Sequence, residues 1–317
     1  MVLVSVVMLS YNHEKYLAEA IESVLNQTIH GLELIIVDDG STDNSRLIIK
    51  EYSAKDSRVK SYFHEKNLGI SRSANDCLKK ATGEYVGFIG SDDLWLPQKT
   101  EKQLKVIDKN PSRIIWSEGQ IIDGNGALTG QTVTEHNYSP AKKSGNIFQE
   151  LLREDFIFGQ SVLMKTEIAK EFSFNENLRF VNDHQYFVEL SKEHDFVFMP
   201  EPLANYRVHG ENSTKKDQKL WFKERIILRN NLIRMYGDII SAQSMADIYY
   251  KIGHAYAGLD EKELAKYYYT KAVFTNPLRS HTPLYVILAL TNGEGFFGET
   301  LESHYKKVLM LSARIFS

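Results

Sequence analysis

The chain has 317 residues, enough for one large domain or two smaller ones, and its 43% hydrophobic and 25% charged content is ordinary for a globular protein. The formal net charge of −3 hides an asymmetry, because residues 215–317 carry 15 Lys and Arg against 10 Asp and Glu, so that residues 1–214 are acidic. The acidic part argues against nucleic acid as a partner, and the single cysteine, Cys77, excludes an internal disulfide.

The first hundred residues alternate between two apolar patterns. Short runs rich in β-branched residues predict strands at Val4–Leu9, Leu34–Val37, Val59–Phe63 and Tyr85–Ile89. Apolar residues at helical spacing predict helices over residues 16–25, 45–52, 70–81 and 97–108. This alternation predicts an α/β fold whose central sheet is mostly parallel and covered by helices on both faces. The run Val2–Leu9 is too short to span a membrane and lacks the flanks of a signal peptide, so we expect a buried strand there.

Residues 110–214 mix strand and helix patterns, and the rest of the chain is helical in pattern. The mixed part predicts strands at Ile114–Trp116, Val162–Met164 and Phe196–Met199, a helix at Val181–Lys192, a turn at residues 124–130 and a polar loop at residues 135–145. We therefore expect two domains, residues 1–214 and an all-α region at residues 215–317.

Residues 246–279 have the spacing of a tetratricopeptide repeat. The residues that carry it are aromatic, small or apolar: Tyr249, Ile252, Gly253, Tyr256, Ala265, Tyr269, Ala272 and Pro277. One repeat cannot bury both of its faces, so it must pack on neighbouring helices, on the first domain or on another copy of the chain. An ordinary helical hairpin is the alternative.

Two pairs of aspartates follow predicted strands in the N-terminal half. Asp38 and Asp39 follow the second strand, and Asp92 and Asp93 come just after the fourth. Ligands of such sheets bind beyond the carboxyl ends of the strands, so we expect both pairs and Tyr11 at one edge. Carboxylates at the edge of a core are costly unless they are bound, and a divalent cation carrying a diphosphate would bind them. The alternative is that each pair only forms a turn and caps the next helix.

A set of short motifs in a fixed order resembles the family 2 glycosyltransferases, which have the GT-A fold. The motifs are Val6–Asn12, Ser23–Thr28, Val37–Asp43, Asn67–Ser71, Ala81–Tyr85, Ser91–Asp93, Asn182–Asp183 and Tyr206–Gly210. Each is weak alone, whereas the ordered set over residues 3–214 is highly specific. The resemblance implies transfer of a sugar from a nucleotide diphosphate donor to an acceptor hydroxyl, with inversion at the anomeric carbon and with Mn²⁺ or Mg²⁺ as cofactor.

The resemblance also implies roles for individual residues. Asp183 matches the catalytic base, and its alternative role is to stabilise the dipole of the helix that it begins. Asp93 is expected to bind the metal directly and His209 to complete the site, with a packed loop histidine as the alternative. Nucleotide contacts are expected from Ser10, Tyr11, Asp39, Arg72 and Asp92. Among these, Tyr11 would stack on the base, and Asp39 would accept a hydrogen bond from a base N–H, which favours uracil. The alternatives to a nucleotide contact are a surface side chain for Arg72 and, for Asp92, a role as partner of the metal ligand Asp93.

Trp95 and Asn182 are expected to line the sugar or acceptor pocket, with packing as the alternative for Trp95. Two positions depart from the family pattern. Gly90 stands where many members carry another Asp, and Asn182 stands where many carry Glu. Gly90 leaves one carboxylate fewer at the metal site. Arg207 is expected to be a diphosphate partner or a structural partner.

The leading hypothesis is an inverting, metal-dependent glycosyltransferase that uses a UDP-sugar to extend a glycan, glycolipid or glycoprotein. The alternative is a degenerate GT-A domain that binds a nucleotide or a partner without turnover. A nucleotidyltransferase is disfavoured because residues 9–14 contain no Gly, Lys or Arg for a phosphate-binding loop. We expect a cytoplasmic location, at the inner face of the membrane if Tyr305–Phe316 contacts lipid rather than its own protein. Homo-oligomer formation through the helical tail is a further expectation.

Overall fold

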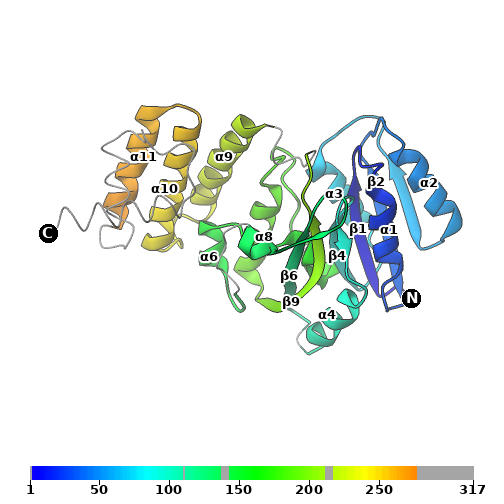
Figure 1. The fold of residues 1–317 in the computed structure, drawn as a ribbon. Coiled ribbons are helices and arrows are strands. Elements are labelled where there is room, and N and C mark those ends of the chain that lie inside the picture. The colour runs from blue at the N-terminus through cyan, green and yellow to red at the C-terminus, as the bar shows by residue number, and fades with distance from the viewer. Residues whose placement is uncertain (1, 110, 137–142, 211–216, 277–317) are drawn as a thin grey trace. The chain divides into compact units, whose positions relative to one another are not determined.

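The computed structural model describes residues 2–109, 111–136, 143–210 and 217–276 (Figure 1). The chain forms two compact units. The α/β unit comprises residues 1–151 and 155–212, and the helical unit comprises residues 213–317 together with residues 152–154. The expected domain boundary, between residues 214 and 215, lies outside the described residues.

A nine-stranded sheet of described residues forms the centre of the α/β unit. Its strand order is β3-β2-β1-β4-β8-β6-β9-β5, with β7 paired to β6. The parallel half consists of β1 (Val4–Ser10), β2 (Leu32–Asp38), β3 (Val59–Phe63) and β4 (Tyr85–Gly90). The other half consists of β5 (Leu94–Trp95), β6 (Ile114–Ile122), β7 (Leu128–Thr132), β8 (Leu163–Lys165) and β9 (Phe196–Arg207). Within it β6 and β9 are parallel, and β8 runs antiparallel to both β4 and β6.

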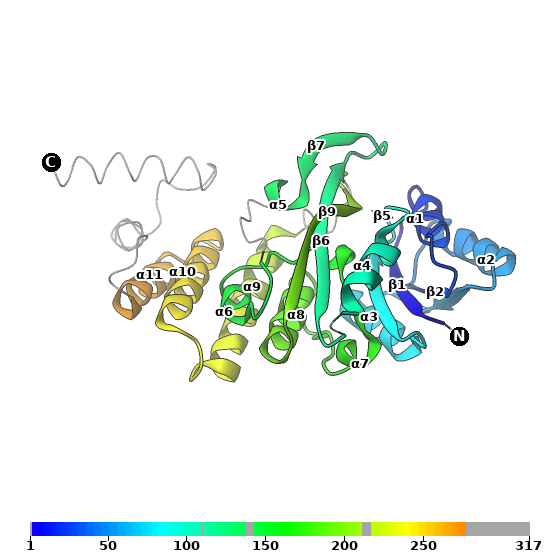
Figure 2. The ribbon, with the colours of Figure 1, turned by 90° about the horizontal axis from the view of Figure 1, so that it is seen from below.

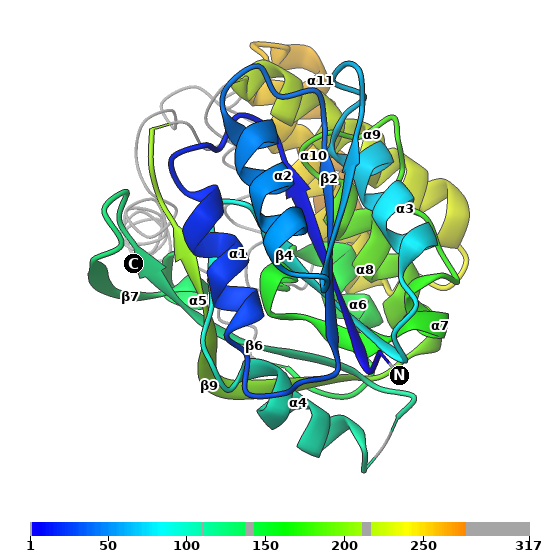
Figure 3. The ribbon, with the colours of Figure 1, turned by 90° about the vertical axis from the view of Figure 1, so that its right-hand side faces the viewer.

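Helices cover both faces of the parallel half. Figures 2 and 3 show α1 (Leu17–Leu25) and α2 (Ser45–Lys55) on one face and α3 (Ile70–Lys80) on the other. Strands covered on both faces have no wet side, which explains why β2 is buried at every residue. The further helical elements before residue 194 are α4 (Lys99–Ile107), α5 (Val133–His136), α6 (Phe148–Arg153), a 3₁₀ turn (Gly159–Ser161), α7 (Thr166–Ala169) and α8 (Asn182–Glu193).

The α/β fold with a mostly parallel sheet and a helical C-terminal region is confirmed. The strands β6 and β9 are longer than predicted, and for β9 the reason lies at a proline. Pro202 pairs with Glu118 beside a shift in the register between β6 and β9. A bulge at this place accommodates the proline, which usually ends a strand, so that β9 continues beyond it. The helix expected to open at Pro97 begins at Lys99, and part of the turn expected at residues 124–130 belongs to β7. The sequence patterns predicted none of β5, β7, α5, α6 and α7.

The helical unit contains α9 (Gln218–Tyr236), α10 (Ala242–Gly258) and α11 (Lys262–Thr275), of which α10 and α11 pack as a hairpin (Figure 1). Gly253 makes their close approach possible, because a Cβ there would lie 2.8 Å from the ring of Tyr269 and 3.1 Å from the carbonyl oxygen of Ala265. This contact joins three positions of the predicted repeat spacing. Pro277 lies outside the described residues, and the tetratricopeptide assignment stays a prediction.

Two ion pairs attach residues 152–154 to the helical unit. Arg153 Nε lies 2.8 Å from Asp247 Oδ2, and Lys251 Nζ lies 3.3 Å from Glu154 Oε1. No helix in the described part of the chain is both long and apolar enough to cross a membrane. The segment Tyr305–Phe316, for which membrane contact was one expectation, lies outside the described residues.

Replacing Gly253 by Leu tests the hairpin packing. A side chain at this position must displace the Tyr269 ring, so we expect the free energy of unfolding of the helical unit to fall by about 1–3 kcal/mol. Thermal and urea unfolding of the full chain measure it, with hydrogen exchange assigning the loss to α10 and α11. Lys266→Leu, on the exposed side of α11, is the matched control. Equal stability of the two variants would contradict the close approach.

Candidate active site

The carboxyl ends of β1, β2 and β4 lie level with one another. The register pairs Ser10 with Asp38 across β1 and β2, and Leu9 with Gly90 across β1 and β4. Residues that directly follow these strands therefore emerge at one edge of the sheet. This edge is where open α/β sheets bind their ligands.

Asp38 and Asp39 have different environments. Asp38 is fully buried and pairs with Arg46, whose Nε lies 3.0 Å from Oδ1, so Asp38 stabilises the turn after β2. The Asp39 carboxylate accepts hydrogen bonds from the backbone N–H groups of Leu68 and Gly69, both at 2.8 Å. Gly69 has φ of 96°, a conformation that favours glycine. Asp39 thus orders the loop that leads into α3.

A pocket lies beside this loop, between the start of α3 and the segment before α8. It is lined by Asn67, Leu68, Gly69, Ile70, Ser71, Arg72, Glu176, Asn177, Leu178 and Arg179. The Nε atom of Arg72 lies 3.2 Å from Asp76 Oδ2, and its Nη1 lies 3.5 Å from Glu176 Oε2. The predicted nucleotide residue Arg72 therefore borders a pocket while it pairs with two carboxylates.

Tyr11 and Ser10 differ in exposure. The Tyr11 side chain is available for the predicted stacking, because the residue is 41% exposed. Ser10 is buried, and its hydroxyl lies 3.5 Å from Asp38 Oδ2. Nucleotide contacts by either residue stay predictions.

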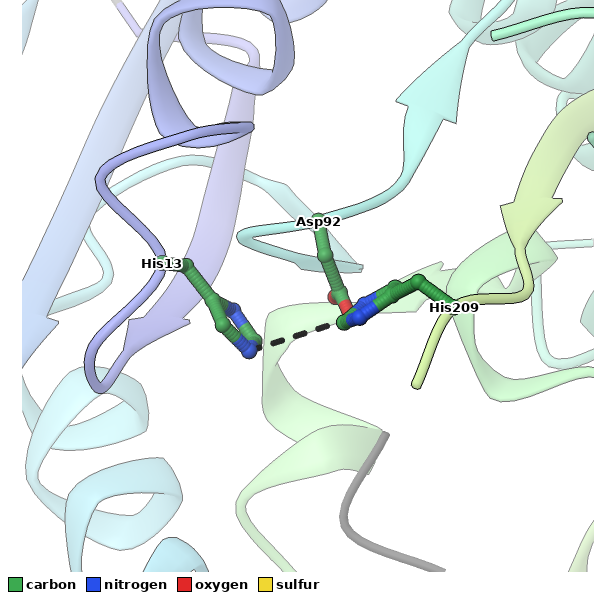
Figure 4. Close-up of side chains that lie close together, drawn as sticks. All are labelled: His13, Asp92 and His209. Carbon is green, nitrogen blue, oxygen red and sulfur yellow. Dashed lines mark hydrogen bonds and ion pairs between the residues drawn. The ribbon is translucent and has the colours of Figure 1, made fainter. Parts of the chain in front are cut away.

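Three side chains from distant parts of the chain converge at this edge (Figure 4): His13, Asp92 and His209. His209 Nε2 lies 3.0 Å from Asp92 Oδ2, and His13 Nε2 lies 3.9 Å from the same oxygen. Burial alone would raise the pKa of Asp92, but the contact with His209 and the nearby His13 outweigh it and hold that pKa below its usual value. Two imidazoles and a carboxylate with their ligand atoms within 4.8 Å of one another can hold a metal ion.

Asp93 points into the protein instead. Its Oδ1 accepts a hydrogen bond from the backbone N–H of Arg207 at 2.9 Å. Burial and the adjacent Asp92 carboxylate raise the pKa of Asp93 well above its usual value. The geometry favours Asp92 over Asp93 as the residue that reaches a metal, and direct coordination by Asp93 stays a prediction.

Arg207 fastens the turn that carries both aspartates. Its guanidinium is 1% exposed, donates from Nε to the Asp92 carbonyl oxygen at 2.8 Å, and pairs through Nη2 with Glu19 Oε2 at 2.7 Å. The guanidinium also lies over the ring of Tyr16, which packs against His209 with the ring centres 4.6 Å apart. Of the two roles expected for Arg207, these contacts fit the structural one.

His13 is the member of the cluster that the sequence analysis missed. Its Nδ1 lies 2.7 Å from Ser91 Oγ, and its backbone N–H donates to Ser45 Oγ at 3.1 Å. The preceding Asn12 adopts the left-handed conformation, with φ of 54°. The sequence offered one signal for a role of His13. It stands three positions after the end of a strand, and that strand end lies at the same edge of the sheet as Asp92.

Asp183 lies in the first turn of α8. One carboxylate oxygen accepts a hydrogen bond from the backbone N–H of His184 at 2.8 Å. Burial, reinforced by the nearby Asp155 carboxylate, raises the pKa of Asp183 to about 7. A carboxylate with this pKa can accept a proton near neutral pH more readily than an ordinary aspartate, which suits a general base.

Trp95 and Asn182, the residues expected in the sugar or acceptor pocket, are both buried. Trp95 is 2% exposed, donates from Nε1 to the Gln160 carbonyl oxygen at 2.8 Å, and covers the buried Lys99 ammonium with its ring. Burial holds the pKa of Lys99 well below its usual value. These contacts correspond to the packing alternative for Trp95. A contact of Asn182 with substrate stays a prediction.

The fold is that of the GT-A type of nucleotide-sugar-binding domain. A family model described as glycosyl transferase family 2 matches residues 5–172, more than half of the chain. The chain belongs to glycosyltransferase family 2.

Named relatives agree with this assignment. The chain is 34% identical over 243 residues to the Escherichia coli UDP-Glc:alpha-D-GlcNAc-diphosphoundecaprenol beta-1,3-glucosyltransferase WfgD, covering 74% of this chain and 90% of WfgD. Staphylococcus aureus TarS in complex with UDP-GlcNAc has a similar fold, with a TM-score of 0.66 at 17% identity over 92% of this chain and 88% of that chain. The mannosyltransferase PcManGT from Pyrobaculum calidifontis, in complex with GDP-Man and Mn²⁺, has a TM-score of 0.58 at 16% identity. The match covers 93% of this chain and 88% of that chain.

Asp183→Asn should stabilise the folded protein at pH 8. The folded-state pKa of about 7 lies above the ordinary value of 3.8, so the folded chain holds this proton more tightly than the unfolded chain. Stability is therefore lost as pH rises from about 4 to about 7. We expect the variant to gain about 1–3 kcal/mol in free energy of unfolding at pH 8.

Urea denaturation at pH 8 and pH 4 measures this effect, which should vanish at the lower pH. Asp123→Asn is the matched control with the opposite sign, because hydrogen bonds from the backbone N–H groups of Ala127 and Asn125 hold the pKa of Asp123 below its usual value. Equal destabilisation of both variants at pH 8 would refute the assignment of a raised pKa.

Proposed function

We propose that this protein is an inverting, metal-dependent glycosyltransferase that transfers a sugar from a UDP-sugar to a hydroxyl of a growing glycan, glycolipid or glycoprotein. The observation that carries the proposal is the convergence of His13, Asp92 and His209 at the carboxyl edge of the sheet. A metal held there would lie at the edge where open α/β sheets bind their ligands, which is the place to stabilise a leaving diphosphate.

The donor set fits a divalent metal. Mg²⁺ prefers ligands that are all oxygen, whereas one carboxylate with two imidazoles suits a transition metal. Because the PcManGT neighbour was solved with Mn²⁺, we infer Mn²⁺ rather than Mg²⁺. Asp92, His209 and His13 would hold the ion, while Asp93 would support them through its hydrogen bond with Arg207. Bound there, the metal would stabilise the negative charge that develops on the leaving diphosphate.

Asp39, Tyr11, Ser10 and Arg72 would bind the nucleotide. The Asp39 carboxylate can accept one more hydrogen bond, and the ring N–H of uracil would supply it. Tyr11 would stack on the base, and Arg72 would exchange a carboxylate partner for a phosphate of the donor. The TarS neighbour with bound UDP-GlcNAc supports a uridine nucleotide.

Asp183 would be the catalytic base. Its carboxylate takes the proton from the acceptor hydroxyl as that oxygen attacks the anomeric carbon from the side opposite the diphosphate. The new glycosidic bond forms while the bond from the anomeric carbon to the diphosphate oxygen breaks, and the configuration inverts. Asn182 would contact the acceptor next to this base.

The acceptor that we propose is a glycan on a lipid carrier. The name of the WfgD relative includes a diphosphoundecaprenol-linked acceptor, which supports a lipid-carried glycan and a site of action at the inner face of the cytoplasmic membrane. We propose that the helical unit is tetratricopeptide-like, and that it positions the acceptor or joins two copies of the chain.

Metal binding distinguishes the two aspartates. We expect Asp92→Asn and His13→Gln each to lower the affinity for Mn²⁺, measured with UDP present, by at least about tenfold. Asp93→Asn keeps the buried shape and should have a smaller effect. Titration followed by Mn²⁺ electron paramagnetic resonance measures all three variants, with thermal unfolding as the control for folding. A larger loss in Asp93→Asn than in Asp92→Asn would restore Asp93 as the direct ligand.

Donor turnover tests the function itself. With Mn²⁺ and a panel of lipid-linked acceptors, we expect one UDP-sugar to release UDP, and Asp183→Asn to lower the rate by at least about 10²-fold while donor affinity stays unchanged. Nucleotide release and calorimetry are the two measurements. Binding of donors without turnover on any acceptor would favour the degenerate, nucleotide-binding alternative.

A further inference from the structure

Ser91 contacts the imidazole ring of His13, the most exposed side chain of the metal cluster. The His13 side chain is 22% exposed, against 14% for Asp92 and 4% for His209. The Oγ atom of Ser91 lies 2.7 Å from His13 Nδ1, and Ser91 itself is buried. The other ring nitrogen, Nε2, lies 3.9 Å from Asp92 Oδ2 (Figure 4). The hydrogen bond with Ser91 therefore engages the ring nitrogen that is not directed at Asp92.

Other hydrogen bonds set the backbone of His13. The loop after β1 interlocks with the loop after β2, because the N–H of Asn12 donates to Ser41 Oγ at 2.9 Å and the N–H of Thr42 donates to Asn12 Oδ1 at 2.8 Å. The backbone N–H of His13 donates to Ser45 Oγ at 3.1 Å. These three hydrogen bonds do not involve the imidazole, so they do not decide how the ring turns about its Cβ–Cγ bond. A half turn about that bond would put Cε1 where Nε2 lies.

A serine hydroxyl suits this position because it can donate to an imidazole nitrogen or accept from one. A neutral histidine that binds a metal through Nε2 carries its hydrogen on Nδ1, and the partner of that hydrogen fixes the direction of the ring. We propose that Ser91 is a positioning residue, whose hydrogen bond with Nδ1 presents the Nε2 atom of His13 to a divalent metal. This inference rests on the proposed function, which places the metal at this cluster.

The second histidine of the cluster is held by different contacts. His209 Nε2 lies 3.0 Å from Asp92 Oδ2, and the His209 ring packs against Tyr16 with the ring centres 4.6 Å apart. Neither contact involves the Ser91 side chain. Loss of the Ser91 hydroxyl should therefore change the direction of the His13 ring and leave Asp92 and His209 in place.

A double-mutant cycle tests whether Ser91 acts through His13. In the full-length protein with UDP present, we expect Ser91→Ala to lower the affinity for Mn²⁺ about tenfold, as loss of the hydrogen-bond partner of a ligating histidine does elsewhere. In a His13→Ala background the same substitution should have no further effect, because the ring on which it acts is gone. Titration followed by Mn²⁺ electron paramagnetic resonance measures all four proteins.

Ser191→Ala is the matched control, because Ser191 is a buried serine of α8 whose hydroxyl donates to the Val188 carbonyl oxygen at 2.8 Å. It should bind Mn²⁺ as the wild type does, and thermal unfolding compares the stability of the two serine variants. Wild-type affinity of Ser91→Ala, or an equal loss in the presence and absence of His13, would overturn the inference while the proposed function stands. If the wild type binds no Mn²⁺, the metal-dependent function is wrong and the inference falls with it.

NMR relaxation of the metal-free protein tests the same contact without a ligand. With ¹³C-labelled histidine, and with His13→Ala to assign the signals, the His13 ring should be as ordered as the backbone in the wild type and clearly more mobile in Ser91→Ala. The His209 ring should be unchanged in the same variant. Equal order of the His13 ring in both proteins would contradict a positioning role for Ser91.

Discussion

The buried guanidinium of Arg207 is the interaction on which the candidate active site depends. It joins the end of β9 to the Asp92 carbonyl oxygen, to Glu19 on α1 and to the ring of Tyr16. A buried charge is tolerated only with partners in good geometry. The guanidinium therefore fixes the positions of these segments relative to one another. The backbone N–H of the same residue also engages Asp93. One residue therefore sets the direction of both aspartates, and through Tyr16 it supports His209.

Environment gives aspartates of the same edge different chemistry. Asp38 is committed to a turn, while Asp39 orders a loop and keeps capacity for a ligand. Asp92 is held in its charged form by histidines, whereas burial and its neighbour favour the protonated form of Asp93. A neighbouring carboxylate raises the cost of ionising the second one. A divalent ion at the cluster, as proposed above, would lower that cost.

The sequence was sufficient for the parallel half of the sheet and for the edge where the site lies, because strand and helix periods are local properties and the alternation of strands and helices implies parallel strands whose carboxyl ends share one edge. It could not distinguish Asp92 from Asp93, since their directions depend on Arg207, more than a hundred residues away. His13 was missed because its position depends on the left-handed Asn12. Trp95 was expected either to line a pocket or to pack, and only the structure shows its contacts with the buried Lys99 and the Gln160 carbonyl oxygen, which depend on tertiary packing.

The departure at Gly90 is also explained by this geometry. A Cβ there would lie 2.7 Å from Asp93 Oδ2 and 2.8 Å from Asp92 Oδ1, so the two carboxylates occupy the space that a side chain would need. An aspartate at position 90 would have to displace at least one of them. In the proposed metal site the missing carboxylate is replaced from the other side of the edge, where the loop after β1 brings His13 to Asp92. Glycine at position 90 and histidine at position 13 are then two parts of one arrangement. The proposed site would then hold a nitrogen ligand in place of an oxygen ligand, which suits Mg²⁺ less well than an all-oxygen site.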